Sequence, residues 1–239
     1  MKKESLTGDK LHRVAAAVLM TVMFAARWAR FDLLRAVGHL ATKLHAWDEW
    51  CDKRLERLMA YIDASLKGRF IGFIGDKLED LTLTAFADAD FAGDRKDCKS
   101  TSGGFLCLTG PRSFFPLVAY SKKQGGTSTS TPEAELVALA DFVKNSALPA
   151  LSLWRAILGK DMPLVIYEDN EAAATICRTG KFKAMRHVLR HHGVRLGFLH
   201  DCVVQGVTLI YEIVTRLSCV LISLLSSLST QYPGNQLLV

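Results

Sequence analysis

Residues 81–94 read Leu-Thr-Leu-Thr-Ala-Phe-Ala-Asp-Ala-Asp-Phe-Ala-Gly-Asp, so that two carboxylates, Asp88 and Asp90, follow an alternating run. The period of two at 81–87 predicts a β-strand. Because side chains two residues apart on a strand point to the same face, Asp88 and Asp90 are expected side by side. Like charges this close repel unless a cation lies between them, and a divalent metal ion is one interpretation. The alternative, from these residues alone, is a solvated strand end that runs into the turn after Gly93.

The composition bounds the size and the charge of the protein. Its 239 residues allow one large domain, or one domain with an appendage. The formal net charge is +6, a modest basic excess that permits an anionic partner without requiring one. The excess is uneven, because residues 172–200 contain no acid but hold six arginines and lysines.

The cysteines and the apolar stretches indicate where the protein works. Six cysteines show neither a Cys-x-x-Cys pair nor a zinc-type spacing, which favours a reducing compartment and an intracellular protein, cytoplasmic or nuclear. The apolar stretches 14–26 and 217–228 fall short of the ~20 residues that span a bilayer. We therefore expect no membrane partner and interpret both stretches as core-facing or interfacial helices, with a signal sequence as the alternative for 14–26.

The hydrophobic pattern predicts an α/β layer fold. Helical periodicity runs from residue 11 to about residue 66, after which the pattern becomes strand-like. Residues 130–133, Ser-Thr-Pro-Glu, are typical of a helix start, and Pro149 is expected to begin a second helix that ends at Gly159. A short helix is expected at 171–177. The predicted strands are 70–74, 81–87, 105–108, 117–121, 164–167 and 207–211, which together describe a mixed sheet with helices on its faces.

Three acids occupy positions where such a fold can gather them. Asp88 is expected at the end of a strand, Glu135 about one turn inside the helix that begins near Pro132, and Asp169 at the end of an interior strand. Carboxylates that hold two divalent ions roughly 4 Å apart can clamp the attacking and leaving oxygens of a phosphoryl transfer. The basic run that follows could then hold a polyanion beside the ions.

Five sequence words resemble the ribonuclease H domain of copia-type retrotransposon Pol polyproteins, in the order and at the spacing of that family. They are Phe86–Gly93, Ser100–Gly104, Ser121–Gln124, Ser130–Glu135 and Glu168–Ala172. Two helical words further upstream, 30–34 and 54–62, are similar to the segment that joins the reverse transcriptase to the nuclease. The resemblance therefore covers roughly residues 11–211.

The resemblance implies a ribonuclease H-like, mixed five-stranded sheet with helices on both faces, preceded by a helical segment. It implies cleavage of RNA in RNA–DNA hybrids with Mg²⁺, or alternatively Mn²⁺, and a reverse transcriptase domain as a further partner. The expected catalytic and metal-binding residues are Asp88, Glu135 and Asp169, with Asp90 and Glu133 beside them. The expected nucleic-acid contacts are Arg178, Lys181, Lys183, Arg186 and Arg190. The implied organisation is a connecting segment at 1–66, the nuclease-like domain at 67–215 and an atypical tail at 216–239.

The sequence departs from the family pattern in two places. A Lys-His-Ile-Asp word usually supplies a fourth acid, but the corresponding word, 186–189, ends in Leu189. His191 and His192 are candidates to replace that acid, although surface histidines are the simpler interpretation. The tail also fails to resemble the family's closing helix. A catalytically silent remnant that only binds nucleic acid, or that serves as a structural connection, is therefore the rival hypothesis. A third hypothesis, an integrase-like strand transferase, is disfavoured because no zinc-binding pattern precedes the acids.

Overall fold

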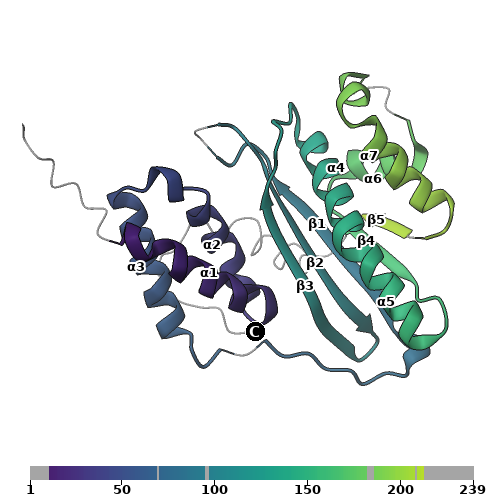
Figure 1. Cartoon of the computed structure of the whole chain (residues 1–239). Helices are drawn as coiled ribbons and strands as arrows, with labels where there is room; N and C mark the ends of the chain where they lie inside the picture. The colour runs from purple at the N-terminus through teal and green to yellow at the C-terminus, as the bar shows by residue number, and fades with distance from the viewer. Residues whose placement is uncertain (1–10, 69, 95–96, 182–185, 208, 213–239) are drawn as a thin grey trace, which may run out of the picture.

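The computed structural model describes residues 11–68, 70–94, 97–181, 186–207 and 209–212. Its centre is a five-stranded sheet in the order β3-β2-β1-β4-β5 (Figure 1). Strands β1, β2 and β3 form an antiparallel meander, and β4 and β5 continue the sheet parallel to β1. The strands are β1 (Thr82–Asp90), β2 (Thr101–Gly110), β3 (Ser113–Lys123), β4 (Leu164–Glu168) and β5 (Leu209–Glu212). The predicted mixed five-stranded sheet is confirmed.

The strands near the carboxylates are longer than the sequence pattern predicts. Strand β1 continues through Asp90 because residues 101–103 pair with it, with Asp88 opposite Gly103. The predicted strand at 70–74 is wrong, since only Phe73 forms a single bridge, to Phe114. Gly72 lies so close to the Phe115 ring that a Cβ would overlap it. This segment therefore contacts the outer edge of β3 through one antiparallel bridge and does not form a further strand.

One face of the sheet is covered by a long helical run. Helix α4 (Thr131–Phe142) continues through a π-helical turn at Val143–Ala147 into α5 (Leu148–Leu158). The predicted second helix is confirmed, because Pro149 sits in the first turn of α5, where its missing N–H is tolerated, and Gly159 ends the helix. By length and composition the run Thr131–Leu158 is apolar enough to cross a membrane, and 44% of its most apolar window is buried in the fold. Helices α6 (Glu171–Thr179) and α7 (Arg186–Val204) pack beside α4.

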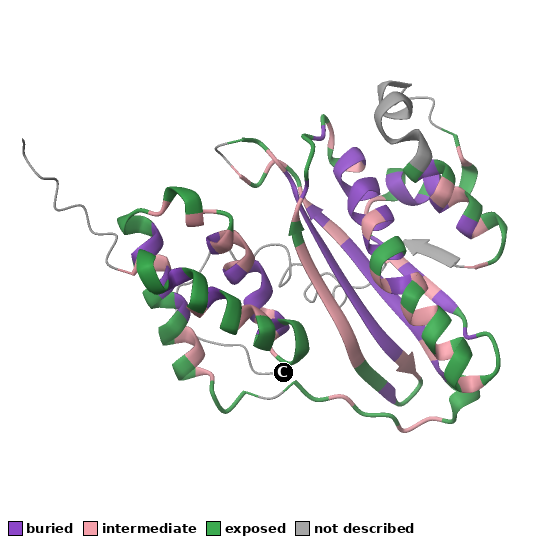
Figure 2. Cartoon of the chain, in the orientation of Figure 1, coloured by how far each residue is buried: buried purple, intermediate pink, exposed green. Residues whose placement is uncertain are grey.

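The other face of the sheet is covered by the helical segment that precedes it. This segment contains α1 (His12–Trp28), α2 (Leu34–Ala41) and α3 (Glu49–Ala64). Its buried side chains share a hydrophobic core with Phe86, Phe105 and Cys107 of the sheet. Figure 2 shows buried residues, in purple, both in these helices and along the strands. Helices on both faces and a preceding helical segment are thus confirmed. Because core residues are shared across residue 66, the domain division at that point remains a prediction.

Candidate active site

Three carboxylates from distant parts of the sequence meet at one end of the sheet. Asp88 comes from β1, Glu135 from α4, and Asp169 from the residue directly after β4. One oxygen of each side chain lies within 4.8 Å of the others. The burial is graded, because Glu135 is buried, Asp88 is half-buried and Asp169 is exposed. The structure therefore brings together the three acids singled out from the sequence.

The register of the parallel strands places Asp88 beside Asp169. Strands β1 and β4 pair with Phe86 opposite Tyr167, and the same register continued by two residues brings the two aspartates together. Asn170 then ends the strand, because its side chain accepts a hydrogen bond from the Ala173 N–H and begins α6. Asp169 is thus held between the end of a buried strand, β4, and the capped start of α6.

The start of α4 fixes the position of Glu135. Ser130 is the N-cap, and its hydroxyl accepts a hydrogen bond from the Glu133 N–H. The buried amide of Gln124 donates both to Ser102 Oγ, at 3.0 Å, and to the Ala134 carbonyl, at 2.9 Å. Strand β2, the end of β3 and the first turn of α4 are therefore joined next to Glu135. The Gln124 side chain thus links the words Ser100–Gly104 and Ser121–Gln124 to the word that contains Glu135.

Glu135 and Asp169 are in an environment that disfavours their charge. Burial, together with Glu168, Asp88 and Asp169, raises the pKa of Glu135 to about 10. Burial and the charge of Asp88 also raise the pKa of Asp169. Atom Oε2 of Glu135 is buried and has no hydrogen-bond partner among the described residues. A cation relieves this repulsion and satisfies the unpaired oxygen, so the site fits a divalent ion.

An all-oxygen set of this kind suits Mg²⁺ or Mn²⁺ in particular. Both ions prefer carboxylate and water ligands. Two neighbouring oxygens on one Mg²⁺ lie about 3 Å apart, given metal–oxygen bonds of about 2.1 Å. The observed separations of up to 4.8 Å require only a small closure of the side chains.

Sequence analysis missed a fourth carboxyl group, Glu168. It alternates with Leu164 and Ile166 along β4, so that it faces α4 and is fully buried. Burial raises its pKa well above the usual value, and the charges of Asp169 and Asp88 add to the rise. Its Oε1 accepts a hydrogen bond from the Asn170 N–H at 3.4 Å, whereas Oε2 has no partner among the described residues. The period of two in residues 164–168 is the signal that could have identified it.

The two acids expected beside the site have partners of their own. Asp90 Oδ2 lies 2.6 Å from Arg35 Nη2 of α2, in an ion pair that the sequence did not suggest. Glu133 Oε2 accepts hydrogen bonds from the N–H and the hydroxyl of Thr129, both at 2.7 Å. Glu133 therefore supports the start of α4, and Asp90 connects the sheet to the helical segment.

The predicted nucleic-acid contacts are only partly within the described residues. Arg178 is exposed near the end of α6, and Lys181 is exposed just beyond that helix. Lys183 lies outside the described residues, as do the side chains of Arg186, Arg190, His191 and His192. Helix α6 has nine residues, so its end lies about 13 Å from its beginning beside Asp169. Lys181 is thus within the width of a nucleic-acid duplex from the carboxylates.

Comparisons with known proteins relate the chain to transposon polyproteins. It is 30% identical over 170 residues to the Retrovirus-related Pol polyprotein from transposon RE1 of Arabidopsis thaliana. It is 33% identical over 174 residues to the corresponding polyprotein from transposon RE2 of the same plant. Each alignment covers 70% of this chain, which spans 11% of the length of either relative. No protein-family model matches the sequence.

Among solved structures, the chain is similar to the foamy viral protease-reverse transcriptase in complex with an RNA/DNA hybrid. The TM-score is 0.49 at 14% identity, and the alignment covers 95% of this chain and 27% of that one. A second similar structure is the RNase H domain of PFV, with a TM-score of 0.41 at 12% identity, over 62% of this chain and 90% of that one.

Proposed function

We infer that the chain is a ribonuclease H-like segment of a retrotransposon Pol polyprotein, and from this premise we propose that it cleaves the RNA strand of RNA–DNA hybrids with divalent cations. The observation that carries the proposal is the convergence of Asp88, Glu135 and Asp169 within 4.8 Å. Three acids from a strand, a helix and a strand end have no common structural task that would bring them together. Their mutual repulsion is instead a feature expected of a cation site.

The residues divide the chemistry between them. Bound Mg²⁺ or Mn²⁺ would supply an activated water molecule and stabilise the charge of the leaving oxygen. Asp88 and Asp169 hold the exposed side of the site, where a phosphodiester can approach. Glu135 holds the buried side, where its unpaired Oε2 is available to a cation. Lys181 and Arg178, which are exposed around the end of α6, would contact the phosphates of the same duplex.

A cleavage assay on matched duplexes tests the proposed substrate. The same sequence is prepared as an RNA–DNA hybrid, as double-stranded RNA and as double-stranded DNA, with one strand labelled. We expect Mg²⁺-dependent cleavage of the RNA strand in the hybrid and none in the presence of EDTA. Selection for the hybrid depends on the 2′-hydroxyl, which distinguishes RNA from DNA, and on the geometry of the opposite strand. Cleavage of the DNA duplex would contradict the substrate class, and no cleavage of any duplex would favour the silent remnant.

Replacing Lys181 by alanine is expected to weaken hybrid binding in a salt-dependent manner. Each phosphate contact contributes about 0.9 to the slope of log K against log salt on duplex DNA. The Lys181→Ala variant should therefore show a slope lower by about 1, with no change in sequence preference. Fluorescence anisotropy at several salt concentrations, in EDTA to prevent cleavage, measures the slope. Lys160→Ala is the matched control, because Lys160 is also an exposed lysine just after a helix. An unchanged slope for Lys181→Ala would show that this surface faces away from the duplex.

A further inference from the structure

Helix α2 reaches the end of β1 through a row of ion pairs. Arg35 Nη2 lies 2.6 Å from Asp90 Oδ2, and the Arg35 side chain is only 8% exposed. Beyond this pair, Asp94 Oδ2 lies 3.4 Å from Lys43 Nζ and 2.6 Å from Lys123 Nζ. Lys43 follows α2, Asp94 follows β1 and Lys123 ends β3. Opposite charges thus connect the helical segment to two strands at the edge of the candidate active site.

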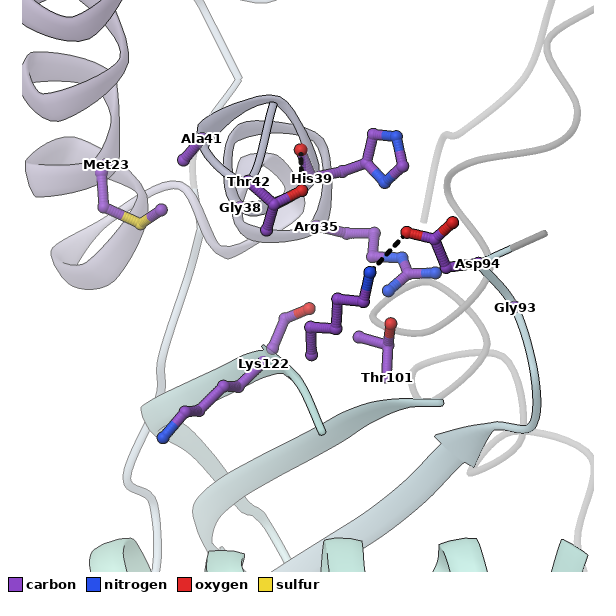
Figure 3. Close-up of a pocket in the computed structure, with 12 residues that line it drawn as sticks. Met23, Arg35, Gly38, His39, Ala41, Thr42, Gly93, Asp94, Thr101 and Lys122 are labelled. Atoms are coloured by element: carbon purple, nitrogen blue, oxygen red, sulfur yellow. Dashed lines mark hydrogen bonds and ion pairs between the residues drawn. The ribbon is translucent and has the colours of Figure 1, made fainter. Parts of the chain in front are cut away.

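The junction at this point is open, unlike the apolar core further along the sheet. A cavity of about 340 Å³ lies between α2 and the strand ends, and Figure 3 shows Arg35 extending from α2 toward the side of the cavity that holds Asp94. Its lining residues include Arg35, His39, Asp94, Thr101 and Lys123. Because solvent and ions can enter such a cavity, ion pairs rather than close packing hold α2 against the end of β1.

Asp90 is placed to interfere with the cation site unless it is paired. It lies two residues after Asp88 on the same strand, so both side chains point to the same face, about 7 Å apart along the chain. Gly93 leaves space for its carboxylate, since a Cβ at that position would overlap Asp90. Burial raises the pKa of Asp90; the charge of Arg35 opposes this rise, and the charge of Asp88 adds to it.

We propose that Arg35 is a positioning residue of the candidate active site, which pairs with Asp90, keeps that carboxylate out of the cation site and fixes the strand end that carries Asp88. The site is therefore completed by the helical segment and is not contained within the sheet and helices α4–α7 alone. The inference rests on the proposed function only in taking Asp88, Glu135 and Asp169 as cation ligands. It adds a residue 53 positions before Asp88 to the structure of that site.

The direction of each change in Mg²⁺ affinity follows from which charge of the Arg35–Asp90 pair is left without its partner. Without Arg35, Asp90 becomes an unpaired carboxylate beside the ligands, and the site attracts cations more strongly. Without Asp90, Arg35 becomes a buried unpaired cation, which repels a divalent ion and destabilises the fold. Removal of both charges leaves the net charge near the site unchanged. A unit charge about 7 Å from a divalent ion in a solvent-like dielectric changes its affinity by about 5- to 10-fold.

The experiment titrates the full chain with Mg²⁺ by calorimetry at one pH and without nucleic acid. We expect Arg35→Gln to bind Mg²⁺ about 5- to 10-fold more tightly, Asp90→Asn to bind it about 5- to 10-fold more weakly, and the double variant to return to within about twofold of wild type. Arg35→Lys, which keeps the charge, should also stay within about twofold. Arg30→Gln is the control, since Arg30 pairs with Asp32 at 2.7 Å inside the helical segment.

The combination of binding and cleavage distinguishes positioning from general structural support. Arg35→Gln should bind Mg²⁺ more tightly yet cleave the hybrid more slowly at saturating Mg²⁺, because Asp90 then competes for the ion. A merely structural role would weaken both properties. Equal or weaker Mg²⁺ binding by Arg35→Gln overturns the proposal if that variant is folded, and a shift in Arg35→Lys overturns it if Arg35→Gln is not. If wild type and its variants show the expected order of affinities but none cleaves the hybrid, the positioning role stands and the proposed function fails.

Discussion

Replacing Asp169 by asparagine is expected to lower the rate of hybrid cleavage by about a thousandfold or more. Loss of a ligand removes several kcal/mol of charge stabilisation from a cation site, and each 1.36 kcal/mol corresponds to about a tenfold change in rate. Asparagine has nearly the same shape as aspartate, and Asp169 is exposed after β4. The change therefore alters the charge of the site with little effect on packing. The measurement is single-turnover cleavage of a labelled hybrid across a range of Mg²⁺ concentrations.

Asp161→Asn provides the matched control for this variant. Asp161 is also an exposed aspartate in a loop next to β4. Its carboxylate pairs with Arg155 at 3.1 Å and not with any of the three acids. An exposed ion pair of this kind contributes little to stability, so cleavage should remain within about twofold of wild type. If Asp169→Asn cleaved as fast as Asp161→Asn, the assignment of the three acids would be wrong. If wild type were as inactive as Asp169→Asn at every Mg²⁺ concentration, the chain would be the silent remnant.

The metal-free protein is expected to lose stability as the pH rises from 7 to 9, and Mg²⁺ should restore it. The pKa of Glu135 is about 10 in the folded protein against an ordinary value of 4.5, so the folded state keeps a proton that the unfolded state has lost. The free energy of unfolding then falls with rising pH, by at most about 1.4 kcal/mol per pH unit for each such group. Glu168, whose pKa burial raises well above its ordinary value, acts in the same direction.

Thermal unfolding at pH 7, 8 and 9, in EDTA and in Mg²⁺, measures this effect. His39, with a pKa lowered by burial and by nearby cations, acts in the opposite direction but below its ordinary value of 6.5, outside the window. A cation that binds only the folded state replaces the protons, so the difference in Tm between Mg²⁺ and EDTA should widen with pH. Glu135→Gln should flatten the pH dependence in EDTA. A Tm in EDTA that rises between pH 7 and pH 9 would contradict the raised pKa of the buried carboxyls.

The sequence predicted the elements that depend on local pattern and on the resemblance. Alternation identified β1, and the hydroxyl–proline–acid start identified α4, which are the elements that carry Asp88 and Glu135. It did not predict Arg35 opposite Asp90, because that contact joins residues 55 positions apart and depends on how α2 docks on the sheet. The pattern also failed at 70–74, where an apolar run forms only one antiparallel bridge to β3 and no strand. Local periodicity indicates which residues are buried, but it does not indicate which other part of the chain covers them.

The helical segment that covers one face of the sheet also determines what a break in the chain would do. Residues between α3 and β1 are mostly exposed where the structure describes them, and exposed loops of this kind are preferred sites of proteolytic nicking. A cut there would separate two polypeptides that still share the core around Phe86 and Phe105 and the Arg35–Asp90 pair. The products would remain a complementing pair of fragments. Processing of a longer precursor at this loop would therefore yield two associated chains and would not release the sheet and helices α4–α7 alone.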